Sequence, residues 1–240
     1  MFKPTSIAIF GASSALALAF KRYFESTIEL ENLFLFSRSP VGDLGPKTSW
    51  YPLNYDTELS FQGAVDALPN KQNFDLVLIC SGLLHEGELQ PEKTYKQVDL
   101  SDMQKVFQVN AFAPMMIAKY FLPRMLSNRE STFAALSARV GSLGDNRLGG
   151  WYSYRASKCA LNMFLKTLSI ECKMRLPLCK VLGLHPGTVN TPLSRPFAKK
   201  TSYKLFTPSE SCLHLLKVLD SCQLQDSGHV FSWDGKRIMD

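Results

Sequence analysis

The sequence predicts an α/β fold in which helices cover both faces of one doubly wound sheet of seven parallel strands. Short β-branched or aromatic runs alternate with longer amphipathic stretches along the whole chain, as expected when crossover helices link parallel strands. Most of the short runs are continuously apolar, which is typical of strands covered on both faces. No repeat with a period of about 20 to 50 residues occurs. No Gly/Ser/Pro-rich linker divides the chain either, so residues 1–240 are interpreted as one domain.

The short runs predict strands at Ile7–Phe10, Leu33–Phe36, Trp50–Leu53, Leu76–Cys80, Thr132–Leu136, Val181–Leu184 and Val230–Trp233. The amphipathic stretches predict helices at Ser14–Phe24, Glu58–Leu68, Asp102–Leu126, Tyr154–Met174 and Pro208–Leu219. Thr207 is a typical N-cap residue and Pro208 suits the first helical position, so the last helix begins there. Two irregular stretches, Gly82–Val98 and Asn190–Ser202, each follow a strand. Open α/β sheets bind ligands at the carboxyl ends of their strands, so we expect these stretches to form walls of a substrate pocket.

The composition is that of a globular protein, with 45% hydrophobic and 20% charged residues. The net charge of +6 is scattered and forms no basic block, which argues against nucleic acid and fits an anionic small ligand. The six cysteines contain no C-x-x-C pair and indicate reduced thiols, and the histidines show no metal-ligand spacing, so we expect no metal site. The apolar run Ile7–Phe20 is interrupted by Gly11 and is too short to span a bilayer. We therefore expect no signal peptide, no membrane association and a cytoplasmic location.

A tight turn follows the first predicted strand and precedes a helix, which is where a pyrophosphate can bind. Gly11 permits the turn, Ser13 and Ser14 offer hydroxyls and N–H groups, and the helix amino terminus adds partial positive charge. A plain helix cap is the alternative interpretation of this segment alone. The βαβ context favours a nucleotide.

Ser37 and Arg38 follow the second predicted strand, where an acidic residue would hydrogen-bond the ribose of NAD. A carboxylate there would repel a 2′-phosphate, whereas an arginine would pair with it. The sequence therefore favours NADP over NAD, the alternative being a surface arginine that binds nothing.

Tyr154 and Lys158 are four residues apart near the start of a predicted helix, so both lie on one helical face. A nearby ammonium favours the phenolate and is expected to lower the tyrosine pKa toward neutrality, as a general acid or base requires. On its own such a pair is usually part of a solvated face. Its combination with the glycine turn favours catalysis.

Four motifs occur in the order found in the short-chain dehydrogenase/reductase family, which the sequence resembles over almost its whole length. They are the turn Gly11-Ala-Ser-Ser-Ala15-Leu-Ala17, Val109-Asn110, Tyr154 with Lys158, and Pro186-Gly187-Thr188-Val189-Asn190-Thr191. Gly141-Ser142-Leu143, Asp145-Asn146 and the segment from Gly149 to Arg155 are similar to the carbonyl reductases of the Sniffer and C-factor type.

The resemblance implies a Rossmann-like domain that uses NADP(H) to reduce the carbonyl of a small molecule. Tyr154 would protonate the carbonyl oxygen, Lys158 would hold the ribose and lower the tyrosine pKa, and Asn110 would fix a water in a proton relay. Family members commonly pair through the helices corresponding to Asp102–Leu126 and Tyr154–Met174, so a homo-oligomer is expected. The implied cofactor-binding residues are Gly11, Ser13, Ser14, Leu16, Ser37, Arg38, Asn54, Tyr55, Ser81, Gly82, Tyr154, Lys158, Pro186, Gly187, Val189 and Thr191, with Asn54 and Tyr55 beside the adenine.

The chain departs from the family pattern at several positions. Ala15 and Ala17 replace glycines of the turn, Ile79-Cys80-Ser81-Gly82 replaces Asn-Asn-Ala-Gly, and Ala138 occupies the position of the usual catalytic serine. Ser137 and Ser142 are the nearby hydroxyls that could replace it. We favour Ser137 as the fourth catalytic residue.

Two further questions stay open at this point. His85 could contact substrate or be solvated, and the basic stretch with Arg195, Lys199, Lys200 and Lys204 could attract an acidic substrate or be a solvated lid. A regulatory or signalling protein that binds NADP without efficient turnover is the alternative to an enzyme, because fold alone does not separate the two.

Overall fold

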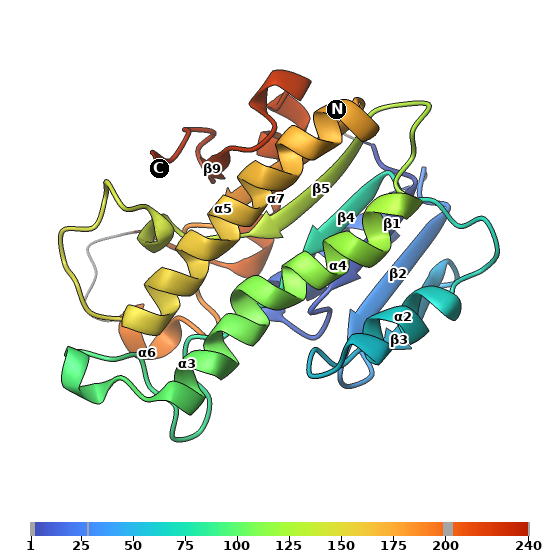
Figure 1. The fold of residues 1–240 in the computed structure, drawn as a ribbon. Coiled ribbons are helices and arrows are strands. Elements are labelled where there is room, and N and C mark those ends of the chain that lie inside the picture. The colour runs from blue at the N-terminus through green and yellow to red at the C-terminus, as the bar shows by residue number, and fades with distance from the viewer. Residues whose placement is uncertain (1–2, 28, 199–203, 240) are drawn as a thin grey trace.

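The computed structural model describes residues 3–27, 29–198 and 204–239, so the predictions that fall on Lys199, Lys200 and Ser202 lie outside the described residues. Seven strands form one sheet in the order β3-β2-β1-β4-β5-β6-β9, and every neighbouring pair is parallel (Figure 1). The strands are β1 (Ser6–Phe10), β2 (Asn32–Ser37), β3 (Thr48–Pro52), β4 (Leu76–Ile79), β5 (Ser131–Leu136), β6 (Cys179–His185) and β9 (Val230–Ser232). All seven predicted strands and the predicted fold class are confirmed.

Helices cover both faces of this sheet because strand side chains alternate between the two faces. Ile7 and Ile9 of β1 belong to the core beneath α1 (Ala15–Glu25) and α7 (Pro208–Ser221), whereas Ala8 and Phe10 belong to the core on the other face. That second face is covered by α2 (Glu58–Asp66), α4 (Ala113–Phe121) and α5 (Tyr152–Arg175), and Figure 1 shows α4 and α5 crossing it. The predicted cap of α7 is confirmed, since Thr207 and Glu210 form a capping box and Pro208 is the first helical residue.

The helix predicted over Asp102–Leu126 is wrong as a single regular element. It consists of α3 (Leu100–Phe107), a π-turn at Gln108–Phe112, α4, and a 3₁₀ turn at Leu122–Arg124. Pro114 explains the break, because proline has no N–H to give to the carbonyl of residue 110. The chain continues instead with an i to i+5 bond from the Ala113 N–H to the Gln108 carbonyl.

Segments for which no element was predicted contain short elements that the hydrophobic pattern did not indicate. A two-stranded parallel pair joins β7 (Thr188–Val189) to β8 (Leu205–Phe206), α6 occupies Arg195–Ala198, and 3₁₀ turns occur at Tyr95–Gln97, Arg139–Gly141 and Leu224–Asp226. Each has only two to four residues, which is too short for a periodic pattern to be read.

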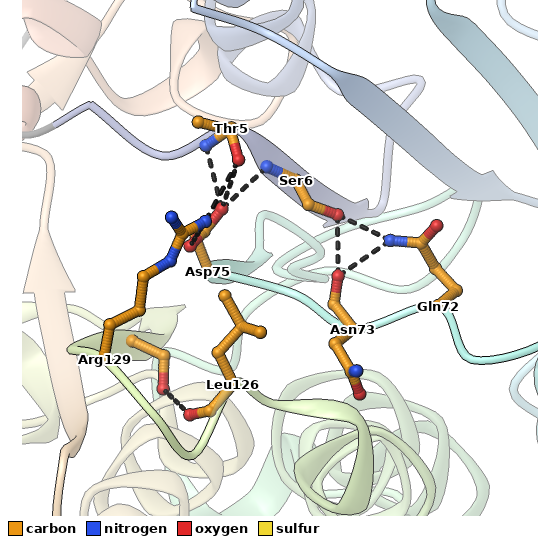
Figure 2. Close-up of polar contacts among 8 residues, drawn as sticks. Thr5, Ser6, Gln72, Asn73, Asp75, Leu126 and Arg129 are labelled. Carbon is orange, nitrogen blue, oxygen red and sulfur yellow. Dashed lines mark hydrogen bonds and ion pairs between the residues drawn. The ribbon is translucent and has the colours of Figure 1, made fainter.

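Hydrogen bonds and an ion pair join the amino ends of β1, β4 and β5 (Figure 2). The predicted site lies at the other end of these strands. Asp75, just before β4, accepts from the Thr5 N–H at 2.9 Å, the Thr5 hydroxyl at 3.0 Å and the Ser6 N–H at 2.8 Å. Arg129, just before β5, pairs with the same carboxylate at 2.7 Å. These bonds hold β1, β4 and β5 together at their amino ends. The loops that form the predicted site follow the carboxyl ends of the strands.

Candidate active site

The turn after β1 has the geometry of a phosphate-binding loop. Gly11 has a φ of +68°, and a Cβ there would lie 2.6 Å from the backbone nitrogen of Ser81, so the position requires glycine. Ser14 is the N-cap of α1, and the first turn of that helix carries no acidic residue. The positive end of the helix dipole is therefore free to face an anion. Ser13 is exposed at the turn, whereas the Leu16 side chain lies in the core, so only the Leu16 backbone can face a cofactor.

Arg38 and Asn54 line one hollow of about 460 Å³, which lies between α2 and the ends of β2 and β3. The Arg38 guanidinium is exposed and pairs with the Glu86 carboxylate at 3.5 Å. Ser37, in contrast, is buried, and its hydroxyl donates to the backbone carbonyl two residues on at 2.6 Å and accepts from the Trp50 indole at 2.9 Å. Ser37 therefore shapes the turn that presents Arg38.

Two buried hydroxyls at this edge of the sheet, those of Tyr55 and Ser81, lie near each other and near the Gly11 backbone, but neither forms a hydrogen bond of normal geometry with the described residues. The Tyr55 ring stacks on Phe61 of α2, and burial raises the pKa of Tyr55 to about 12, so its hydroxyl keeps its proton. Buried polar atoms are seldom left unpaired in folded proteins. Since Ser81 directly abuts Gly11, these two hydroxyls and the hollow beside Arg38 fit the adenosine half of a dinucleotide.

Asn110 lies in the π-turn and joins the segment after β4 to α5. Its side-chain amide donates to the Leu83 carbonyl at 2.8 Å and to the Ser157 hydroxyl at 3.0 Å, and its side-chain oxygen accepts from the Leu83 N–H at 2.8 Å. A Cβ on Gly82 would lie 3.8 Å from that oxygen and 3.9 Å from Lys158 Nζ, so the Gly82 backbone stands beside both groups. The Asn110 side chain is thus committed to holding the site together.

Tyr154 and Lys158 lie in the first two turns of α5 and both are buried, as their spacing predicts for one helical face. Lys158 Nζ donates to the Leu136 carbonyl at the end of β5 at 2.9 Å and lies 5.9 Å from the centre of the Tyr154 ring. Burial lowers the pKa of Lys158 to about 8 and raises the pKa of Tyr154 to about 12. The expectation that the ammonium lowers the tyrosine pKa is wrong for this arrangement, because desolvation of the phenolate dominates.

The three residues considered for the serine position have different surroundings. Ser137, directly after β5, donates its only hydroxyl proton to Asn162 Oδ1 at 2.5 Å, about two helical turns along α5 from Tyr154. The Ser142 hydroxyl accepts from the Asp145 N–H at 3.1 Å. Ala138, between the strand and the 3₁₀ turn, offers no hydrogen-bonding side chain. The assignment of Ser137 stays a prediction.

The nicotinamide-side residues implied by the resemblance, Pro186, Gly187, Val189 and Thr191, follow β6 and include β7. Gly187 has a φ of +75°, and a Cβ there would lie 2.8 Å from the Phe206 ring, so glycine is required. Because β5 and β6 are parallel neighbours, their carboxyl ends bring this segment to the same edge of the sheet as Tyr154 and Lys158. His185, at the end of β6, is half-buried, and desolvation of its ring lowers its pKa to about 4, so the ring is neutral.

An aromatic wall runs from Tyr154 through Trp151 and Phe197 to His85, and sequence reasoning missed most of it. The successive ring centres are 6.1, 5.1 and 5.6 Å apart. The His85 ring nitrogen lies 3.2 and 3.1 Å from the carbonyl oxygens of residues 192 and 193, so His85 ties the segment after β4 to the segment before α6. The aromatic residue before the Tyr-x-x-x-Lys motif and the position of His85 after a strand were the signals for this wall.

The potential metal-ligating side chains of the described residues are dispersed. Those residues contain no group of three or more His, Cys, Asp or Glu side chains that could hold a metal ion. The same residues contain no helix long and apolar enough to cross a membrane.

Comparisons with known proteins give consistent similarities. The family model for short chain dehydrogenases matches residues 48–202. The C-signal of Myxococcus xanthus is 33% identical over 141 residues, which is 59% of this chain and 80% of the relative. A 1-hydroxy-2-glutathionyl-2-methyl-3-butene dehydrogenase of Rhodococcus sp. is 34% identical over 138 residues, or 58% of each chain. The sequence match thus spans little more than half of that dehydrogenase.

Among solved structures, the NADPH-bound carbonyl reductase from chicken fatty liver has a TM-score of 0.86 at 24% identity and covers both chains completely. The carbonyl reductase Sniffer of Drosophila melanogaster has a TM-score of 0.84 at 20% identity, covering 98% of this chain and 99% of its own. At such identities the likeness is one of fold, and it extends over the whole chain.

Proposed function

The chain belongs to the short-chain dehydrogenase family, and from that premise we propose that it is an NADPH-dependent carbonyl reductase. Its substrate would be a small-molecule ketone, aldehyde or quinone, which is reduced to the alcohol. The observation that carries the proposal is the burial of Tyr154 and Lys158 on one face of α5, beside Gly82 and Asn110, at the edge of the sheet that carries the glycine turn. A module that only binds nucleotide has no need of a buried phenol there.

Several groups of residues would hold the cofactor. Gly11, Ser13, Ser14 and the backbone of Leu16 would contact the pyrophosphate, and Arg38 would pair with the 2′-phosphate. Asn54, Tyr55 and Ser81 would surround the adenosine, Lys158 would hold the nicotinamide ribose, and Gly82, Pro186, Gly187, Val189 and Thr191 would flank the nicotinamide half. When bound, NADPH supplies the hydride that reduces the carbonyl carbon. The bound NADPH of the chicken carbonyl reductase supports this choice of cofactor.

Tyr154 would donate its phenolic proton to the carbonyl oxygen as the carbon–oxygen double bond becomes an alcohol, and solvent would return that proton to the phenolate. Because burial raises the pKa of Tyr154 to about 12, the phenol is protonated at neutral pH and holds the proton that reduction consumes. Lys158 would place positive charge near the phenol while the proton leaves. Asn110 would order a water of the relay through its backbone carbonyl, because its side-chain amide already binds Leu83 and Ser157. Ser137 would hydrogen-bond the substrate oxygen.

A regulatory protein that binds NADP with little turnover is the second candidate. Ala138 removes the usual serine, and the Ser137 proton goes to Asn162. The similarity to the C-signal fits this alternative as well, though not better.

A homo-oligomer paired through the helices around α4 and α5 is part of the proposal. Met163, Ile170 and Met174 are exposed apolar side chains on one face of α5, where a second copy could cover them. A cytoplasmic location is proposed as well, since all six cysteines are free thiols and five of them are buried.

A screen of NADPH oxidation against ketones, aldehydes and quinones tests the proposal, with Tyr154→Phe as the matched inactive control. We expect at least one carbonyl to accelerate oxidation in the wild-type protein only. NADPH binding without any accelerated oxidation would favour the regulatory candidate.

A further inference from the structure

Glu92 is a buried acidic side chain that the proposed chemistry does not use. It lies in the segment between β4 and α3, the stretch predicted to form a substrate wall, and is only 6% exposed. Among residues 3–27, 29–198 and 204–239, no lysine or arginine forms an ion pair with its carboxylate. A buried carboxylate is costly unless hydrogen bonds and nearby positive charge stabilise it.

The amino terminus of α5 supplies those partners. The Ser153 N–H, in the first turn of the helix, lies 3.3 Å from each oxygen of the Glu92 carboxylate, and the Ser153 hydroxyl donates to one of the same oxygens. Carboxylates are favoured at this end of a helix because unpaired N–H groups and the helix dipole both face them. Glu92 thus caps α5 from a segment about 60 residues away, directly before Tyr154.

The backbone of Glu92 also controls how the chain enters that helix. Its carbonyl accepts from the Trp151 N–H at 2.5 Å, and a Cβ on Gly150 would lie 3.3 Å from the same carbonyl. Gly149, Gly150 and Trp151 have φ values of +63°, +65° and +53° in succession. Tryptophan rarely adopts a left-handed conformation, so neighbouring contacts must hold Trp151 in it.

The backbone conformation of Trp151 determines where its ring lies against the rings of Tyr154 and Phe197. The Trp151 ring makes an edge contact with Tyr154, with ring centres 6.1 Å apart, and another with Phe197 of α6, with ring centres 5.1 Å apart. Glu92, Ser153 and Tyr154 also line one small cavity of about 10 Å³. A shift at Glu92 would therefore move both the first turn of α5 and the Trp151 ring of the aromatic wall.

We propose that Glu92 is a positioning residue for the reductase reaction. By capping α5 and holding Trp151 in the left-handed conformation, it sets the Tyr154 hydroxyl and the Trp151 ring against the substrate. The inference deepens the proposed function and rests on it. A positioning role predicts a loss in the chemical step or in substrate binding, with NADPH binding unchanged. The hydrogen bonds and ring contacts described for Glu92, Ser153 and Trp151 reach only Tyr154 among the proposed cofactor-binding residues.

Steady-state kinetics on the full chain provide the first test, using a carbonyl that the wild-type protein reduces. We expect Glu92→Gln to lower kcat/KM at least about tenfold and Glu92→Ala to lower it more, since small displacements of reacting groups cost up to about a hundredfold in rate. The NADPH dissociation constant should stay within about twofold of wild type. Glu88→Gln, in an exposed glutamate of the same segment, is the matched control and should keep wild-type kinetics.

A double-mutant cycle tests whether Glu92 acts through the aromatic wall. If it does, the losses in kcat/KM from Glu92→Gln and Trp151→Phe will be less than additive in the double variant. Fully additive losses would overturn the coupling. Ser153→Ala removes only the hydroxyl donor and should cause a smaller loss of the same kind, so the test survives even if Glu92→Ala does not fold.

A measurement without substrate separates failure of this inference from failure of the proposed function. In protein labelled with 5-fluorotryptophan, the ¹⁹F resonance of Trp151 should shift in Glu92→Gln, while those of Trp50 and Trp233 serve as internal controls and stay in place. An unmoved Trp151 resonance, or kcat/KM within twofold of wild type in a folded Glu92→Ala protein, would overturn the positioning role. If the Trp151 resonance shifts but the protein reduces no carbonyl, the proposed reductase function is wrong, whereas the effect of Glu92 on Trp151 is supported.

Discussion

The ammonium of Lys158 lies 5.9 Å from the centre of the Tyr154 ring, and its hydrogen bond goes to the Leu136 carbonyl at the end of β5. The two side chains share one buried space without a direct bond between their polar atoms. Lysine and tyrosine are thus held by separate parts of the structure, one by the sheet and the other by its place in α5. Their contributions can be separated by mutation.

Replacing Tyr154 by phenylalanine removes only the hydroxyl. We expect Tyr154→Phe to abolish carbonyl reduction and to leave NADPH affinity nearly intact, because the phenol is proposed to work on the substrate oxygen. Lys158→Ala should reduce both activity and NADPH binding. Initial rates of NADPH oxidation measure the activity, and fluorescence titration measures the NADPH affinity. Wild-type turnover by Tyr154→Phe would exclude the proposed mechanism.

Lys158 should make the stability of the cofactor-free protein depend on pH. Its pKa is lowered from 10.5 to about 8 in the folded state, so between these values the unfolded chain binds more protons and stability rises with pH. We expect urea unfolding to show a gain of about 1–3 kcal/mol from about pH 7 to pH 9.5 that Lys158→Met lacks. Lys217→Met, in an exposed lysine of α7, is the control, and an equal gain in Lys158→Met and wild type would contradict this assignment.

Arg38 and Glu86 should have opposite effects on the choice of cofactor. Arg38→Ala is expected to weaken NADPH about ten- to a hundredfold and to spare NADH, because one charge-assisted phosphate contact is lost. Glu86 now pairs with Arg38 and would compete with the phosphate, so Glu86→Gln should tighten NADPH about two- to fivefold, as expected for loss of an exposed ion pair. Parallel titrations with both cofactors measure this. No difference between NADPH and NADH in the wild-type protein would refute the preference.

The serine question can be answered with two variants. If Ser137 supplies the hydrogen bond to the substrate oxygen, Ser137→Ala should cost about 2 kcal/mol or more in transition-state stabilisation, and Ser142→Ala should cost little. Asn162→Ala, which frees the Ser137 proton, should then leave activity unchanged or raise it. The reverse ranking of the two serine variants would assign the role to Ser142, and full activity in both would place the contact elsewhere.

The exposed face of α5 should govern oligomerisation. Ile170→Glu introduces a charge among Met163, Ile170 and Met174, and we expect it to shift the protein to monomers in analytical ultracentrifugation. Leu213→Glu, at an exposed leucine of α7, tests for a general effect of added charge. A wild-type protein that is monomeric at micromolar concentration would contradict pairing through this helix.

The sheet could be predicted from the sequence because its strands are covered on both faces and therefore continuously apolar. Ile7 to Phe10 and Leu76 to Ile79 are examples, and both are fully buried or nearly so. The helix around Asn110 could not be predicted, because the effect of Pro114 depends on whether the chain ends the helix or continues by a π-turn. A 3.6-residue pattern does not distinguish these outcomes.

The site was predictable where its residues are close in the sequence. The spacing of Tyr154 and Lys158 places both on one helical face wherever the helix packs in the fold. The contacts of Ser137 with Asn162 and of Glu92 with Ser153 join residues 25 and 61 positions apart, and no local pattern encodes them. The Tyr154 pKa was misjudged for a related reason, since desolvation depends on burial by distant segments.

The π-turn at Gln108–Phe112 inserts one extra residue between the regular helices α3 and α4. One extra residue rotates a helical face by about 100°, so α3 and α4 are out of phase with each other by that amount. A deletion of one residue between 100 and 121 would change this phase by about 100° and turn either Asn110 away from Leu83 or α4 away from its sheet. Substitutions at the exposed positions of this stretch would leave the orientation of α3 relative to α4 unchanged. This stretch should therefore tolerate amino-acid substitutions far better than insertions or deletions.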